Sequence, residues 1–237
     1  MMSELPEVDV LYQQGPCLAV WKPAGVATQA PPGIDSLETR IKQQLARAAE
    51  PGEAIYLGVP HRLDRPVSGA MVFATTRKAT RRLAEQFERR EVQKIYWACV
   101  AGTIQPERGT WQDFMRKVPG QAHAEIVPAD HPDAQLAVLH YRVLGVAEFG
   151  TWLEVALETG RTHQIRVQAA ARGHTVLGDQ QYGSTMPFGP ETDDPRARAI
   201  ALHGRQLTFR HPTTKEQIRV TAALPDYWQQ LGYTFEA

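Results

Sequence analysis

Short apolar stretches outnumber helical ones in this chain, and the two kinds do not alternate in a regular order. Residues 17–21 (CLAVW), 69–75 (GAMVFAT) and 95–100 (IYWACV) have the length and composition of buried strands. Further strands are expected over 136–146 and 151–157. Regular alternation would favour a doubly wound parallel sheet. This order instead predicts an α/β protein of the α+β type, with a central mixed, mostly antiparallel sheet flanked by helices.

Four helices are expected among these strands. The first begins near Asp35, which with Glu38 three residues later has the spacing of a capping box. The others span 77–91, 164–172 and 227–231. A chain of 237 residues is long enough to bury a core of its own as one large domain.

The overall charge is balanced, because 26 Lys and Arg residues face 26 Asp and Glu residues. This total does not indicate nucleic-acid binding, which usually shows as a basic excess. The distribution is uneven, however, and residues 77–94 hold seven cations and only three acids. Such a run is either a solvated helix face or a track for phosphate groups.

The two cysteines, Cys17 and Cys99, lie in apolar runs and form no CxxC spacing. We therefore expect buried thiols, no zinc site and a protein of the reducing cytoplasm. No apolar stretch reaches the length of a membrane span, so no membrane partner is expected.

Asp64 stands between two arginines in the run 61–65 (HRLDR). The positive charges of Arg62 and Arg65 favour its ionised form, and Pro60 and Pro66 limit the freedom of the backbone around it. A charged carboxylate on a rigid loop can act as a nucleophile. The same residues also fit a structural ion pair, and the run alone leaves both readings open.

Two further segments could belong to a binding site. In 158–166 (ETGRTHQIR), Arg161 or Arg166 could hold a phosphate beside a helix start, or the segment could be an ordinary helix entry capped by Thr162. On the strand 95–100, Tyr96 could stack on a nucleic-acid base or belong to the core.

Several other chemistries find no motif here. The sequence has no GxxxxGK[ST], GxGxxG, GxSxG or HExxH pattern, and its histidines show no close metal-ligand spacing. Asp64 and Glu158 could form the carboxylate pair of a glycosidase, which would require a second carboxylate within about 5–10 Å of Asp64.

Taken in order, these segments resemble the motifs of the RluA family of pseudouridine synthases. Residues 61–69 (HRLDRPVSG) resemble the family signature, and 21–25 (WKPAG) resemble its early lysine-proline turn. The remaining motifs are 94–98 (KIYWA), 160–167 (GRTHQIRV), Gly178-Asp179 with Tyr182-Gly183, and Leu202-His203 through His211-Pro212. The resemblance covers about residues 15–225 and implies one pseudouridine synthase catalytic domain over 1–237.

The resemblance implies that uridine in RNA is isomerised to pseudouridine, with no cofactor and no metal. Carried over by position, Asp64 is the nucleophile, Tyr96 packs on the target base, and Arg166 pairs with Asp64. Arg62 would enter the RNA where the target nucleotide is flipped out. The full set of positions implied to bind RNA is Arg62, Arg65, Arg161, Thr162, His163 and Gln164.

The chain departs from the family pattern at two positions, with Val67 where Thr is frequent and Gln168 where His is frequent. About twenty residues precede the lysine-proline turn, so we expect a compact member without an N-terminal S4-type RNA-binding domain. The expected partner is a stem-loop of rRNA or tRNA, and the protein is expected to be a monomer in the cytoplasm. The alternative is a non-catalytic RNA-binding protein that retains the fold.

Overall fold

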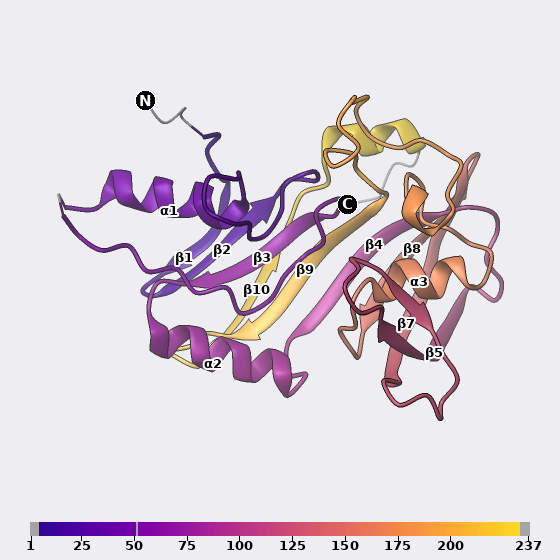
Figure 1. Cartoon of the computed structure of the whole chain (residues 1–237), viewed down its shortest axis with the longest axis horizontal. Coiled ribbons are helices and arrows are strands. Elements are labelled where there is room, and N and C mark those ends of the chain that lie inside the picture. The colour runs from indigo at the N-terminus through magenta and orange to yellow at the C-terminus, as the bar shows by residue number, and fades with distance from the viewer. Residues whose placement is uncertain (1–4, 51, 233–237) are drawn as a thin grey trace. The chain divides into compact units, whose positions relative to one another are not determined.

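The computed structural model describes residues 5–50 and 52–232. This part of the chain divides into two compact units. Unit 1 runs to Gln93 and includes Gly204–Ala223, and unit 2 comprises Lys94–His203 with the residues from Leu224 onward. Figure 1 labels most of the helices and strands.

Unit 1 is built on a sheet in which the pairs β1–β2, β2–β3 and β9–β10 are antiparallel. Its strands are β1 (Val10–Gln14), β2 (Cys17–Lys22), β3 (Ser68–Ala74), β9 (Leu202–Arg210) and β10 (Gln217–Thr221), and the first two residues of β9 belong to unit 2. They are ordered β1-β2-β3-β9, and β10 pairs with β9. The register sets Cys17 opposite Ala74 and Lys22 opposite Gly69, so the central strand β3 is buried along its whole length.

The helices α1 (Leu37–Ala48) and α2 (Arg77–Glu88) cover opposite faces of this sheet (Figure 1). Ala19 and Val72 share a core with Leu83 of α2. Leu18, the neighbour of Ala19, instead lines a groove of about 140 Å³ together with Ile41 of α1. Successive side chains of a strand point to opposite faces, which explains why one strand serves both helices.

Unit 2 contains a second antiparallel arrangement. Its strands are β4 (Gln93–Val100), β8 (Gly150–Leu157), β7 (Gln135–Ala147), β5 (Arg108–Lys117) and β6 (Ala124–Ile126), in that order, and the first residue of β4 belongs to unit 1. Consecutive members of this series pair antiparallel.

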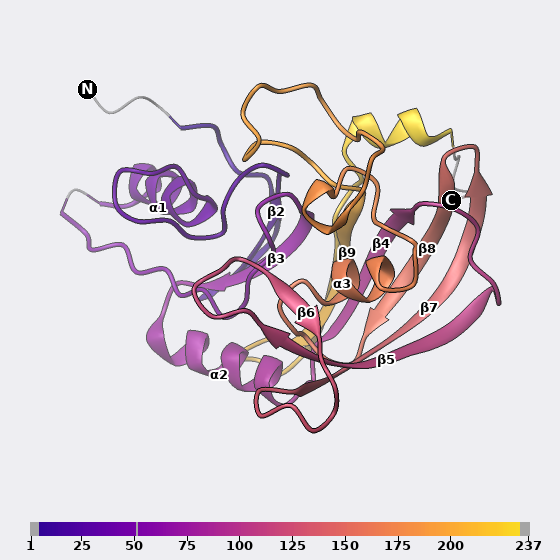
Figure 2. The ribbon, with the colours of Figure 1, turned by 45° about the vertical axis from the view of Figure 1, so that its right-hand side comes forward.

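Three short helical segments complete unit 2: α3 (Gln164–Ala170), η1 (Gln180–Tyr182) and η2 (Asp226–Leu231). Figure 2 shows α3 beside β6, and Val167 of α3 packs with the buried Met115 and Ala124. Near η2, the rings of Trp152 and Trp228 lie 5.1 Å apart and both are buried.

The predicted fold class is confirmed: strands dominate, the sheet is mostly antiparallel, and helices flank it. The predicted helix start was wrong by one residue. Ser36 caps α1, because its Oγ accepts the Thr39 N–H at 3.2 Å, whereas Asp35 accepts from Arg40 Nε at 2.9 Å. That hydrogen bond holds the pKa of Asp35 below its usual value. No helix within 5–50 and 52–232 is long and apolar enough to cross a membrane.

Candidate active site and RNA interface

Asp64 lies on an irregular segment of unit 1 that leads into β3. Leu63 is buried, and both of its backbone groups bind Thr28: the Thr28 hydroxyl donates to the Leu63 carbonyl at 2.8 Å, and the Leu63 N–H donates to the Thr28 oxygen at 3.3 Å. After Asp64 the chain turns, with the Val67 N–H donating to the Asp64 carbonyl at 3.1 Å. The backbone is therefore held on both sides of the carboxylate, as a positioned nucleophile requires.

The side chain of Lys22 also holds this segment in place. Its ammonium donates to the carbonyls of Pro23 at 2.9 Å, Arg65 at 3.2 Å and Val67 at 2.7 Å. Lys22 is 0 % exposed, and this burial lowers its pKa to about 7. The charge of Asp64 opposes the shift and that of Arg65 adds to it. Sequence reasoning gave Lys22 no role, although a lysine directly after five apolar strand residues was a visible signal.

The start of the HRLDR run is anchored to neighbouring elements of unit 1. His61 Nε2 accepts the Val72 N–H at 3.0 Å, and its ring stacks on Phe87 of α2 with centroids 4.3 Å apart. Arg62 is exposed and Arg65 is partly exposed, so both can reach solvent. Their contact with RNA stays a prediction.

Tyr96 lies on β4, as predicted, and pairs with Val155 of β8. The first part of β4 is partly exposed, whereas Ala98, Cys99 and Val100 are fully buried. The strand therefore changes from accessible to core within a few residues, with Tyr96 in the accessible part. Stacking of Tyr96 on a base stays a prediction.

Arg166 projects from α3 into a buried ion pair. Its Nε donates to Asp179 Oδ2 at 2.6 Å and its Nη2 to Asp179 Oδ1 at 2.8 Å. Nη2 also donates to Gln181 Oε1 at 2.8 Å. Arg166 and Asp179 are 3 % and 1 % exposed. Two parallel hydrogen bonds to one carboxylate fix the plane of the guanidinium.

Tyr182 links the loop before α3 to this ion pair. The Arg166 guanidinium carbon lies 4.9 Å from the centroid of the Tyr182 ring, and His123 stacks on the ring at 4.9 Å. The Tyr182 hydroxyl accepts the Ala124 N–H at 3.0 Å and lies 2.7 Å from His163 Nδ1. Because its oxygen accepts from Ala124, the hydroxyl can donate its proton to His163. His163 adopts a left-handed conformation with φ 54°.

Two of the predicted RNA-binding residues, Arg161 and Gln164, are hydrogen-bonded to each other at the start of α3. Gln164 is buried, and its Oε1 accepts from Thr159 Oγ1 at 2.8 Å and from the Arg161 N–H at 3.0 Å. Arg161 Nε donates to the Leu136 carbonyl at 2.9 Å. The N-cap position of α3 is His163 rather than Thr162, and it makes no side-chain cap. Gln164 thus shapes the loop, and its contact with RNA stays a prediction.

The structure gathers these residues into two sets. Asp64, Arg62 and Arg65 belong to unit 1, whereas Tyr96 and Arg166 belong to unit 2. The pairing of Arg166 with Asp64 stays a prediction. Within unit 2, sequence reasoning missed the roles of Asp179 and Tyr182, although both stood in recognised motifs. Among the described residues, no group of three or more His, Cys, Asp or Glu side chains could hold a metal ion.

Comparison with known proteins places these residues in context. The family model described as RNA pseudouridylate synthase matches residues 17–171. The tRNA pseudouridine synthase C of Haemophilus influenzae is 32% identical over 239 residues, which cover 96% of this chain and 98% of that protein. The ribosomal large subunit pseudouridine synthase D of Xanthomonas campestris pv. campestris is 34% identical over 94% of this chain and 68% of that protein.

Solved structures resemble the fold. Human RNA Pseudouridylate Synthase Domain Containing 1 aligns with a TM-score of 0.70 and 26% identity, covering 92% of this chain and 84% of that one. Human RNA Pseudouridylate Synthase Domain Containing 4 aligns with a TM-score of 0.74 and 24% identity, covering 93% and 90%. The latter likeness is one of fold alone.

Proposed function

The chain belongs to the RNA pseudouridylate synthase family, of the RluA type, and we propose that it isomerises specific uridines in structured rRNA or tRNA with Asp64 as the nucleophile. The observation that carries this assignment is the held backbone around Asp64. Thr28 binds both backbone groups of Leu63, and the buried Lys22 binds two carbonyls beyond Asp64. An acid that served only as a surface ion-pair partner would not require this support.

The proposed reaction conserves every atom of the uridine. The Asp64 carboxylate attacks either C1′ of the ribose or C6 of the base, and the C1′–N1 bond breaks. The uracil then turns, a C1′–C5 bond forms, and the carboxylate is released. The proton at C5 is lost while N1 gains one, so the product is an isomer. The step requires no cofactor, metal or redox partner.

Tyr96 and Arg166 have supporting roles in this proposal. Tyr96 packs on the target base and assists removal of the C5 proton, and Arg166 pairs with Asp64. The target base must leave its stack, which costs a few kcal/mol. A loop uridine in a stem-loop reduces that cost, and Arg62 fills the space that the flipped nucleotide vacates. The protein acts as a monomer in the cytoplasm.

The test is product mapping on unmodified RNA. Wild type, Asp64→Asn and the control Asp9→Asn are each incubated with rRNA and tRNA that lack pseudouridine, and the sites formed are mapped. Asp9 is an exposed acid of unit 1, so its replacement removes the same charge. We expect pseudouridine at defined positions from wild type and Asp9→Asn, and none from Asp64→Asn.

Two outcomes would overturn the proposal, each at a different level. If wild type binds RNA but forms no pseudouridine in either pool, the protein is a non-catalytic RNA-binding member of the family. If Asp64→Asn still forms pseudouridine at the wild-type rate, the reaction stands but the nucleophile is another residue.

A further inference from the structure

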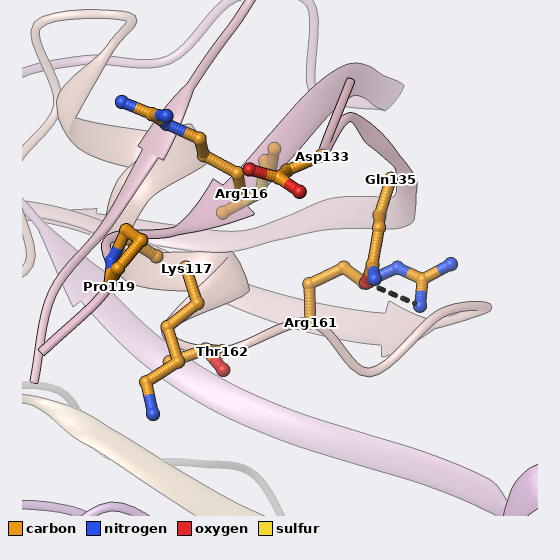
Figure 3. Close-up of a pocket in the computed structure, with 9 residues that line it drawn as sticks. Arg116, Lys117, Pro119, Asp133, Gln135, Arg161 and Thr162 are labelled. Atoms are coloured by element: carbon orange, nitrogen blue, oxygen red, sulfur yellow. Dashed lines mark hydrogen bonds between the residues drawn. The ribbon is translucent and has the colours of Figure 1, made fainter. Parts of the chain in front are cut away.

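Unit 2 contains a pocket of about 270 Å³ whose lining includes neither Arg166 nor Asp179. Its lining comes from the end of β5 and the turn after it, the first residue of β6, the start of β7 with the residues before it, and the loop before α3 (Figure 3). Its lining residues are Met115, Arg116, Lys117, Pro119, Ala124, Asp133, Gln135, Arg161 and Thr162. Met115 and Ala124 are the buried apolar residues of this lining, and most of the others are polar or charged.

The charges of this pocket favour an anion. The charge of Arg116 is compensated, because its Nε and Nη2 lie 2.7 and 2.6 Å from Glu125 Oε1. The other charged residues of the lining are two cations, Lys117 and Arg161, and one carboxylate, that of Asp133. The lining therefore retains a net positive charge, although the chain as a whole has none.

The guanidinium of Arg161 is held in position by the protein before any ligand binds. Arg161 Nε donates to the Leu136 carbonyl at 2.9 Å, and Nη1 donates to Gln135 Oε1 at 3.1 Å, the bond dashed in Figure 3. A guanidinium held by two acceptors loses little further freedom when it binds a ligand. Lys117 is exposed, and its flexible ammonium can adjust to the ligand as a point charge. Thr162 adds a hydroxyl to the same lining.

We propose that this pocket binds a phosphate group of the RNA backbone, with Lys117 as the residue whose contact is new. This inference rests on the proposed function, because it assumes an RNA substrate. Contacts to phosphates fix the register of a bound nucleic acid without reading its bases. The pocket would thus position the RNA while other residues act on the target uridine.

The test compares three single-charge variants by RNA binding. Lys117→Gln removes a cation from the pocket, Asp133→Asn removes its acid, and Lys215→Gln removes an exposed cation between β9 and β10 of unit 1 as a control. Fluorescence anisotropy measures Kd at several salt concentrations. The probe is a transcript carrying a uridine mapped in the product assay or, if none was mapped, a pool of unmodified tRNA.

The two pocket variants should change RNA affinity in opposite directions. Lys117→Gln should weaken binding roughly fivefold, the range of an exposed charge pair, and reduce the slope of log K against log salt by about 1. Asp133→Asn should strengthen binding severalfold, because it removes a negative charge facing the phosphate. For a modified site, kcat should be unchanged by Lys117→Gln while KM rises.

A structural defect cannot imitate this pattern, because it would weaken binding in both pocket variants. The inference is overturned if Lys117→Gln behaves like Lys215→Gln, if Asp133→Asn fails to strengthen binding, or if wild type binds neither probe. If these binding predictions fail while wild type forms pseudouridine, the pocket inference is wrong and the proposed function stands. If wild type forms no pseudouridine, the proposed function is wrong, and the binding measurements still decide whether the pocket binds RNA.

Discussion

Replacement of Lys22 with methionine tests how a fully buried ammonium supports the segment of Asp64. Methionine keeps an unbranched side chain but removes the charge and all three hydrogen-bond donors. Two effects on stability oppose each other at neutral pH. Each carbonyl that Lys22 binds loses a charge-assisted hydrogen bond worth about 1.5–3 kcal/mol, while the cost of burying a cation disappears. The absolute change in stability is therefore less decisive than its dependence on pH.

The expected pH dependence follows from the lowered pKa of Lys22, which falls from 10.5 to about 7 on burial. Between these values the unfolded chain binds a proton that the folded chain does not. Stability contributed by Lys22 is therefore fully present above 10.5, declines as the pH falls towards 7, and is constant below 7. The slope is about 1.4 kcal/mol per pH unit, and over the full shift the difference reaches about 5 kcal/mol.

Urea unfolding of wild type and Lys22→Met, measured from pH 6 to 9.5, gives this slope directly. Because other groups titrate equally in both proteins, the difference between the two curves isolates Lys22. It should stay level up to pH 7 and then move by about 3 kcal/mol in favour of wild type by pH 9.5. Lys215→Met, at an exposed position, should run parallel to wild type. Parallel curves for Lys22→Met would refute the reasoning, because Lys22 would then keep its proton in the folded protein.

Three further changes have defined outcomes. Tyr182→Phe removes the hydroxyl that joins the Ala124 N–H to His163, and should lower the free energy of unfolding by about 1 kcal/mol in urea titrations. Gly69→Ala would place a Cβ against the β9 backbone at φ 132°, and should cost at least about 2 kcal/mol in the same assay. Cys17 and Cys99 should resist thiol reagents at pH 8 until urea is added, because burial raises the pKa of each to about 12. Rapid labelling of the native protein would contradict that last expectation.

The parts of the fold that the sequence predicted are those with strong apolar runs. β3 is buried at every residue and β2 at five of its six, and both have clear strand composition. β5 was missed, because Arg108–Lys117 carries polar or charged side chains at most positions and only two of its ten residues are buried. Its strand conformation comes from pairing with β7 over eight residues. Tertiary pairing of this kind leaves little trace in the local pattern.

The end of α2 shows a similar limit. The charged residues 89–91 are compatible with a longer helix, but α2 ends at Glu88 and Arg90 turns to a positive φ of 58°. The Arg89 N–H still donates to Glu85, and the Glu91 N–H donates back to Gln86. These bonds satisfy the terminal carbonyls that an ended helix leaves open. No residue in 89–91 is a glycine or proline, so the stop has no local sequence signal.

The sequence predicted site residues whose side chains stand in a recognised motif. It did not predict which other residues those side chains bind. Arg166 was recognised, but the sequence contains many carboxylates and does not say which of them lies beside it. The structure pairs it with Asp179, thirteen residues later, beyond the helix end. A buried guanidinium has five N–H donors and requires several acceptors, so one predicted partner was never a complete account. Asp179, Gln181 and the face of Tyr182 fix its plane within unit 2. In the proposed contact, Asp64 would therefore bind an arginine whose orientation is already fixed. The conformational entropy of the Arg166 side chain is lost when unit 2 folds and not when the contact forms.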